Sequence, residues 1–202
     1  RQRVEGHEYS ISHFKDNFYI ITNKDKSKNF KLMRTSLKNT NQKNWKDIIE
    51  HRKKILLEGI EIFNDFLVVI ERDSGLVKMN VRKWDNSQNY YLPIEGETYS
   101  LSIGTNIDFK STKIRYNFSS LNTPSSVIDF DMETKLFDVK KKQEVVDDNF
   151  NEANYITERL WAKSHDGTKI AISLIRHSET KLNDQTPLLL YGYGSYLSLI
   201  HI

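Results

Sequence analysis

The sequence predicts a mostly-β chain built from repeated four-stranded sheets. Composition is the first reason, because the 202 residues include 3 alanines against 41 isoleucine, valine and threonine residues together. β-branched residues lose rotamer freedom in helices and pack well on pleated sheets, so this bias favours strands along the whole chain. Spacing is the second reason, because short apolar segments recur between clusters of Asn, Asp, Lys and Ser, the pattern of strands joined by turns.

Twelve candidate strands fall into three sets of four. The sets cover residues 9–13, 18–22, 30–35 and 45–49, then 55–63, 66–71, 76–84 and 89–94, then 99–103, 113–118, 126–131 and 135–139. Their second strands begin at Phe18, Phe66 and Lys113, a step of 48 (66 − 18) and then 47 (113 − 66) residues. Four short strands repeated at this period are typical of β-propeller blades, so we expect about three blades. An ordinary β-sandwich with irregular hairpins is the alternative.

A different kind of sheet is expected after about residue 148. Residues 149–154 are polar enough to be a linker, and residues 158–164 and 168–176 flank Asp166 and Gly167. Asp-Gly between alternating segments is a strong hairpin signal. After a polar loop at 178–186, residues 187–191 (PLLLY) are too short for a helix and predict a buried strand. A hairpin followed by a fully apolar strand suggests the start of an α/β sheet.

Charge and composition exclude several classes of function. The net charge is +3, and the largest local excess, +5 in residues 1–50, is too dispersed for a nucleic-acid footprint. The basic runs at 52–54 and 140–142 are expected to be solvated turns. No apolar run approaches the roughly 20 residues of a membrane helix. The absence of cysteine excludes a disulfide framework, a thiolate metal site and a cysteine nucleophile in this stretch.

No complete catalytic set is present in the sequence. It contains no Gly-x-Ser-x-Gly motif, and its six histidines lack metal-ligand spacing, so we expect neither metal nor cofactor. His165, beside Asp166, is expected only to enter a tight turn. The most informative local feature is the Gly192, Tyr193, Gly194 turn, because glycines let the backbone turn sharply where α/β sheets place ligands.

The order of several short segments resembles the prolyl oligopeptidase family of serine peptidases. The segments are residues 7–10 (HEYS), 18–23 (FYIITN), 29–32 (NFKL), 57–59 (LEG), 119–124 (SSLNTP), 158–161 (ERLW) with 166–168 (DGT), and 187–196 (PLLLYGYGSY). Each is weak alone, but their order covers almost the whole chain. Members of this family carry a seven-bladed propeller packed over an α/β-hydrolase domain.

The resemblance implies a domain organisation. Residues 1–148 would be the C-terminal blades of the propeller, and residues 149–196 the start of the α/β-hydrolase peptidase domain. Residues 197–202 depart from the family pattern and are expected to be a truncation or frame-shift tail. Since the chain starts with neither Met nor an apolar signal core, we expect a fragment of a longer protein. The resemblance, together with the absence of cysteine, implies a cytoplasmic location.

The resemblance also implies a function. The family hydrolyses short peptides, and the branch that this chain resembles cleaves after Arg or Lys. Tyr193 matches the tyrosine that stabilises the oxyanion, and Tyr196 matches an aromatic residue of the specificity pocket in prolyl-specific relatives. The serine, aspartate and histidine of the triad would follow this stretch, so the chain alone is expected to be inactive. A free-standing propeller-like binding module without catalysis is the competing hypothesis.

Overall fold

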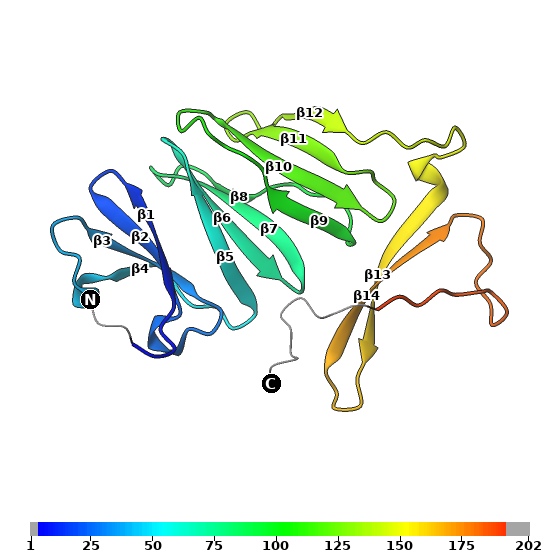
Figure 1. The fold of residues 1–202 in the computed structure, drawn as a ribbon, viewed down its shortest axis with the longest axis horizontal. Coiled ribbons are helices and arrows are strands. Elements are labelled where there is room, and N and C mark those ends of the chain that lie inside the picture. Colours follow the sequence, from blue (N-terminus) through cyan, green and yellow to red (C-terminus); the bar gives the residue numbers. More distant parts are fainter. Residues whose placement is uncertain (1–3, 193–202) are drawn as a thin grey trace.

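The structure is a computed structural model that describes residues 4–192. Within that range the chain forms β-strands and three short 3₁₀ helices, η1 (Lys24–Lys26), η2 (Gln42–Asn44) and η3 (Glu152–Asn154). The strands make three four-stranded sheets and one two-stranded hairpin, and Figure 1 shows the three larger sheets side by side. No helix in residues 4–192 is long and apolar enough to cross a membrane.

Each four-stranded sheet is an antiparallel meander whose strand order follows the chain. The first contains β1 (Tyr9–Phe14), β2 (Asn17–Thr22), β3 (Lys31–Ser36) and β4 (Lys46–Ile49); the second β5 (Ile55–Ile62), β6 (Phe66–Asp73), β7 (Leu76–Lys83) and β8 (Asn89–Tyr91); the third β9 (Tyr99–Ile103), β10 (Lys113–Ser120), β11 (Ser126–Asp131) and β12 (Phe137–Lys142). The predicted three sets of four strands are therefore confirmed. A single two-sheet sandwich over this region is excluded.

The second sheet is buried on both faces because it packs between the other two. Along β6, Phe66 and Val68 contact the third sheet, whereas Leu67 and Val69 point to the opposite face and contact the first sheet. Burying such a side chain contributes about 1.5–3 kcal/mol. The third sheet supplies Leu101, Ile114, Tyr116, Phe130 and Met132, and the first supplies Phe14, Tyr19, Ile21, Leu32 and Ile49.

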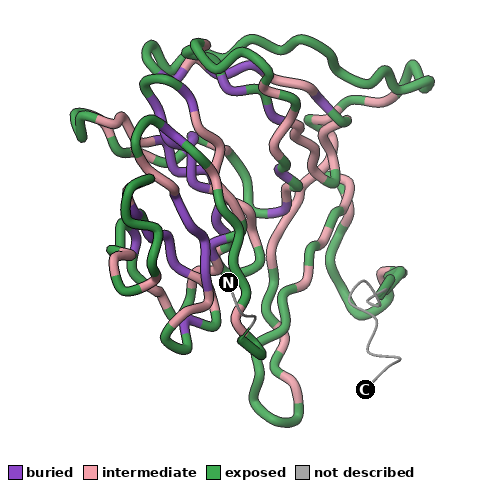
Figure 2. The backbone as a smooth tube through the Cα atoms, turned by 60° about the vertical axis from the view of Figure 1, so that its left-hand side comes forward, coloured by how far each residue is buried: buried purple, intermediate pink, exposed green. Residues whose placement is uncertain are grey.

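The hairpin that follows is more exposed than the sheets. It consists of β13 (Tyr155–Lys163) and β14 (Lys169–His177), paired antiparallel around the Asp166 and Gly167 turn as predicted. Gly167 has a φ of +86°, a conformation that glycine adopts without strain. Figure 2 shows the buried residues concentrated in the four-stranded sheets, while the hairpin is intermediate or exposed.

Residues 187–191, predicted as a buried strand, do not form one. They have no regular secondary structure, and Leu188, Leu189 and Leu190 are 74%, 91% and 78% exposed. A strand needs neighbours for its backbone hydrogen bonds and its side chains. Within residues 4–192 the only sheet beyond the third is the β13–β14 hairpin, and it does not pair with this segment.

Two smaller predictions were also wrong. The basic run at 140–142 lies in β12, the edge strand of the third sheet, and not in a turn; exposed lysines on an edge strand discourage pairing with other chains. Strand β8 ends at Tyr91 and not at residue 94. Pro93 has no backbone N–H to donate, which ends regular pairing there.

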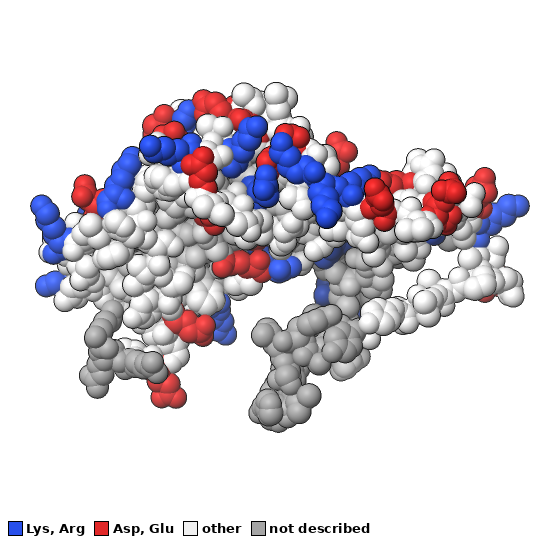
Figure 3. Space-filling model, turned by 45° about the horizontal axis from the view of Figure 1, so that its top comes forward, with Lys and Arg blue, Asp and Glu red and all other residues white. Residues whose placement is uncertain are grey.

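Opposite charges pair locally over much of the surface. In the view of Figure 3, basic and acidic side chains are interspersed above the sheets. The Lys83 ammonium lies 2.9 Å from a Glu133 oxygen and connects the second sheet to the third. On one face of the third sheet, Arg115 donates two hydrogen bonds, of 2.7 and 2.8 Å, to Asp129. Exposed pairs of this kind contribute about 0–1 kcal/mol each.

The buried ring of Tyr116 predicts a loss of stability at high pH. Burial raises the pKa of its hydroxyl to about 12, whereas the unfolded chain ionises near 10. The stabilisation by the un-ionised hydroxyl is fully present below about pH 10. The free energy of unfolding then falls by about 3 kcal/mol as the pH rises to about 12. The Tyr116→Phe variant, which keeps the ring, should lose less stability between pH 9 and 12 than the natural protein in urea titrations. Parallel losses in both proteins would contradict this.

Candidate functional site

The two tyrosines predicted from the sequence, Tyr193 and Tyr196, lie outside the described residues. The described chain ends at Gly192, the residue before Tyr193, and Gly192 is exposed. A Cβ added at Gly192 would meet no atom within 4 Å.

The described residues contain no assembled catalytic site. The nearest approach to a triad is in the β13–β14 turn, where the Ser164 hydroxyl lies 3.4 Å from Nδ1 of His165. Asp166, the adjacent acid, accepts a hydrogen bond from the Thr168 backbone and holds the turn. That bond and one from the Thr168 side chain lower the pKa of Asp166. No group of three or more His, Asp or Glu residues within 4–192 could hold a metal ion.

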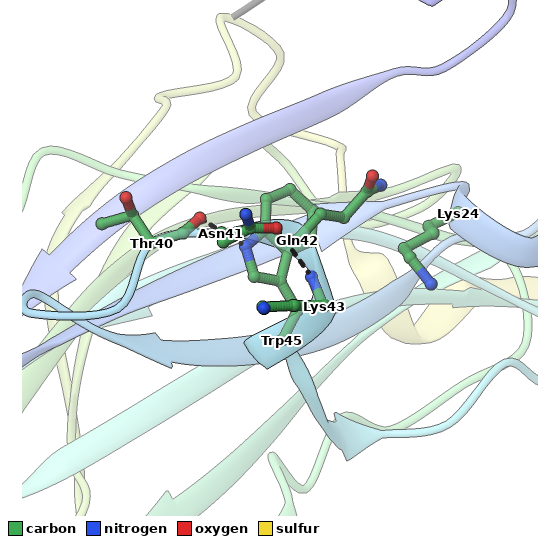
Figure 4. A pocket seen from close by; sticks show the side chains of 6 residues that line it. All are labelled: Lys24, Thr40, Asn41, Gln42, Lys43 and Trp45. Carbon is green, nitrogen blue, oxygen red and sulfur yellow. Dashed lines mark hydrogen bonds between the residues drawn. The ribbon is translucent and has the colours of Figure 1, made fainter.

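A surface depression of about 720 Å³ lies beside η2. Its wall is the segment from Thr40 to Trp45, where the Trp45 indole donates to the Thr40 carbonyl at 3.1 Å. Figure 4 shows that Lys24 reaches the depression from a different segment. The side chains there are amides, a hydroxyl, an indole and two lysines, which include no acid–base pair or activated nucleophile. We assign no chemistry to this depression.

The most buried polar arrangement is centred on Glu71 in β6. Its side chain is 1% exposed and lies on the same face of the strand as Leu67 and Val69. One carboxylate oxygen accepts a 2.5 Å hydrogen bond from Arg52. The other accepts bonds from Arg52 at 3.3 Å and from the Tyr91 hydroxyl at 2.7 Å. Both oxygens are therefore satisfied by charge-assisted or hydroxyl donors.

Neighbouring groups fix this arrangement in place. The side chain of Asn29, in the loop before β3, donates to the carbonyls of Arg52 and Lys53 at 3.2 and 2.9 Å. Burial is the largest single effect on Arg52 and lowers its pKa, but the hydrogen bonds and charges of Glu71 and Tyr91 together raise the pKa overall. Burial, followed by the hydrogen bond to Glu71, raises the pKa of Tyr91. The arrangement is a structural ion pair in which both carboxylate oxygens of Glu71 already have donors.

Sequence analysis did not find this ion pair. It treated residues 52–54 as a solvated turn, which is wrong for Arg52 because its guanidinium binds the buried carboxylate. One signal was available in the sequence. Glu71 continues the apolar stretch of β6, and a charged residue in a strand that is buried on both faces needs a partner.

A second contact joins the hairpin to the second sheet. The Nη2 atom of Arg159 in β13 donates a 2.6 Å hydrogen bond to the carbonyl of Ser74, in the turn between β6 and β7. Gly75 completes that turn, and a Cβ added to it would lie 2.8 Å from the same nitrogen. We call Arg159, Ser74 and Gly75 the hairpin junction.

The chain belongs to the prolyl oligopeptidase family. Residues 1–143 match the family description "Prolyl oligopeptidase, N-terminal beta-propeller domain". The three four-stranded sheets occupy that same stretch, so this region is propeller domain.

The curated relatives of this chain include an aminopeptidase and a protease. Dipeptidyl aminopeptidase BI from Pseudoxanthomonas mexicana is 33% identical over 190 residues, covering 94% of this chain and 26% of the relative. Protease 2 from Moraxella lacunata is 25% identical over 197 residues, covering 96% of this chain and 27% of the relative. The chain thus spans about a quarter of the length of these relatives.

Solved structures show the same fold. Oligopeptidase B from Trypanosoma brucei, in a closed form with covalently bound antipain, superposes with a TM-score of 0.82 at 28% identity, over 97% of this chain and 29% of that one. Oligopeptidase B from Leishmania major superposes with a TM-score of 0.76 at 24% identity, over 89% of this chain and 26% of that one.

Proposed function

We propose that this chain is part of a serine peptidase of the oligopeptidase B type, which hydrolyses short peptides after Arg or Lys. The observation that carries the proposal is the extent of the similarity. The propeller match ends at residue 143, but the similarity to the Trypanosoma brucei oligopeptidase B structure extends over 97% of the chain. The residues after 143 are therefore shared with this relative although they lie beyond the propeller match. We interpret them as the beginning of a catalytic domain.

In this proposal the chain has two functional parts. Residues 1–148 are the last three blades of the propeller, and residues 149–196 begin the α/β-hydrolase domain with the hairpin and the irregular segment 187–191. The exposed leucines of that segment would be covered by the rest of such a domain. Residues 197–202 would be a truncation or frame-shift tail. We propose a cytoplasmic location, on the resemblance and the absence of cysteine.

The catalytic contribution of this chain would come from Tyr193. Its hydroxyl would donate a hydrogen bond to the oxyanion that forms when the serine attacks the peptide carbonyl. A preorganised donor of this kind lowers the barrier by about 3–4 kcal/mol. Tyr196 would line the specificity pocket. The nucleophile and its histidine and aspartate would come from the segment that follows.

The 202-residue chain alone should not hydrolyse peptides after Arg or Lys. Without a nucleophile, oxyanion stabilisation leaves only a small part of the catalysis. The test compares hydrolysis of an Arg-amide fluorogenic peptide by the purified chain and by the complete protein. We expect turnover only from the complete protein, and a serine-reactive phosphonate should abolish it. An inactive complete protein would favour a propeller-like binding module, and phosphonate-sensitive turnover by the chain alone would contradict the assignment of the triad to the missing segment.

A further inference from the structure

The β13–β14 hairpin meets the four-stranded sheets at two levels. At its base, the side chain of Asn122 in the third sheet's β10–β11 loop donates to the Tyr155 carbonyl at 3.3 Å. Four residues further along β13, Arg159 reaches the β6–β7 turn of the second sheet. The first contact therefore lies at the start of β13, and the second lies four residues along it.

The β6–β7 turn is shaped to accept an arginine. Ser74 and Gly75 both have positive φ, +53° and +83°. Two guanidinium groups bind the two carbonyls of this turn. Arg159 donates to the Ser74 carbonyl at 2.6 Å, and Arg72 of the same sheet donates to the Gly75 carbonyl at 3.1 Å. Arg72 is itself held by a 2.6 Å bond to Glu58.

The guanidinium of Arg159 is positioned from both sides. Its central carbon lies 5.3 Å from the ring centroid of Trp161, two residues along the same face of β13. On the other side the backbone of Gly75 approaches so closely that a methyl group there would lie 2.8 Å from Nη2. A Cβ at this position would therefore displace Nη2 from the turn, and the positive φ also favours glycine there.

We propose that Arg159 is a positioning residue that fixes the orientation of the catalytic domain on the propeller through the hairpin junction. The inference rests on the proposed function, because it takes the hairpin as the first element of that domain. The hydrogen bond joins residues 85 positions apart. β13 pairs with β14 along its whole length, so rotation of β13 would move the whole hairpin relative to the propeller.

The absence of cysteine allows a direct test on the 202-residue chain. Nitroxide labels are attached to two introduced cysteines, Lys54→Cys before β5 and Lys169→Cys on β14. Pulsed electron paramagnetic resonance then measures the distance between the second sheet and the hairpin. We expect a narrow distance distribution in the natural background and a broad one in Arg159→Ala and in Gly75→Ala. Arg159→Lys should also broaden it, since an ammonium lacks the flat guanidinium. An unchanged distribution in Arg159→Ala would overturn the proposal.

Gly167→Ala is the matched control for Gly75→Ala. Both glycines lie in hairpin turns with nearly equal φ, +86° and +83°, but the nearest atom to a Cβ at Gly167 is a flexible Lys163 carbon at 3.6 Å. Both changes place an alanine at a nearly equal positive φ, and only Gly75→Ala obstructs Arg159. Equal broadening in the two variants would contradict the proposal, because strain alone would then account for it.

In the complete protein, Arg159→Ala should lower kcat/KM for an Arg-amide peptide by about two- to tenfold, with an unchanged melting temperature. Full activity would contradict the role in positioning. If the complete protein has no peptidase activity but the label distances broaden as expected, the proposed function fails and the structural contact stands. If it is active and the distances are unchanged, only the inference about Arg159 fails.

Discussion

The Arg52→Met variant should lower the free energy of unfolding by about 3–5 kcal/mol, because it leaves the Glu71 carboxylate buried without its cation. The two partners differ in exposure: the Glu71 side chain is 1% exposed and that of Arg52 is 30% exposed. Removing Arg52 leaves the Glu71 carboxylate charged and buried, where water cannot reach it. In Glu71→Gln, by contrast, Arg52 can turn towards solvent. Urea denaturation at pH 7 should therefore show a smaller loss for Glu71→Gln than for Arg52→Met.

Two further variants distinguish the cost of the unpaired buried charge from the cost of lost side-chain packing. The double variant Arg52→Met/Glu71→Met should recover most of the loss, since replacing a buried ion pair by apolar side chains is often neutral. Lys78→Met is the surface control, because its ion pair with Asp73 is 39% and 32% exposed and should contribute at most about 1 kcal/mol. A double variant as unstable as Arg52→Met would show that shape, and not charge, decides the cost.

Under the proposed function, Tyr193→Phe in the complete protein should lower kcat/KM by about one to three orders of magnitude, the range for losing one oxyanion donor. The hydroxyl would meet the carbonyl oxygen only as it becomes an oxyanion, so the loss falls on the transition state. Much of it should appear in kcat if acylation limits the rate. Phenylalanine keeps the ring, so folding should be unchanged.

The melting temperature of the same Tyr193→Phe variant is its control. If the hydroxyl merely satisfied a nearby backbone group, the substitution would cost about 1 kcal/mol of stability and leave turnover nearly unchanged. A large fall in kcat/KM at constant melting temperature supports the catalytic role, and the reverse pattern contradicts it. Tyr196→Phe tests the pocket separately, through the ratio of kcat/KM for Arg and Lys substrates.

The strands were predictable because local signals and packing agree in them. The β6 segment is apolar without alternation, and the structure buries it on both faces between two sheets. The Asp166 and Gly167 turn has the backbone that its residues favour. In these elements burial and turn chemistry act within a few residues, so a single sequence contains enough information to place them.

The polar contacts were not predictable because they join distant positions. The Arg52 bond to Glu71 spans 19 residues, and the Arg159 bond to Ser74 spans 85. Charged residues near turns usually face water, and only the stacking of the sheets determines which of them are buried. Residues 187–191 failed for a related reason: an apolar stretch becomes a strand only beside other strands, and within residues 4–192 none pairs with it.

We propose that this propeller region belongs to a serine peptidase whose triad is encoded after Tyr196. The most direct measurement is the genomic sequence downstream of that codon, read in all three forward frames. We predict a Gly-x-Ser-x-Gly motif followed by an aspartate and then a histidine, the order of an α/β-hydrolase triad. A stop codon in every frame before any such motif would contradict the claim and leave a binding module.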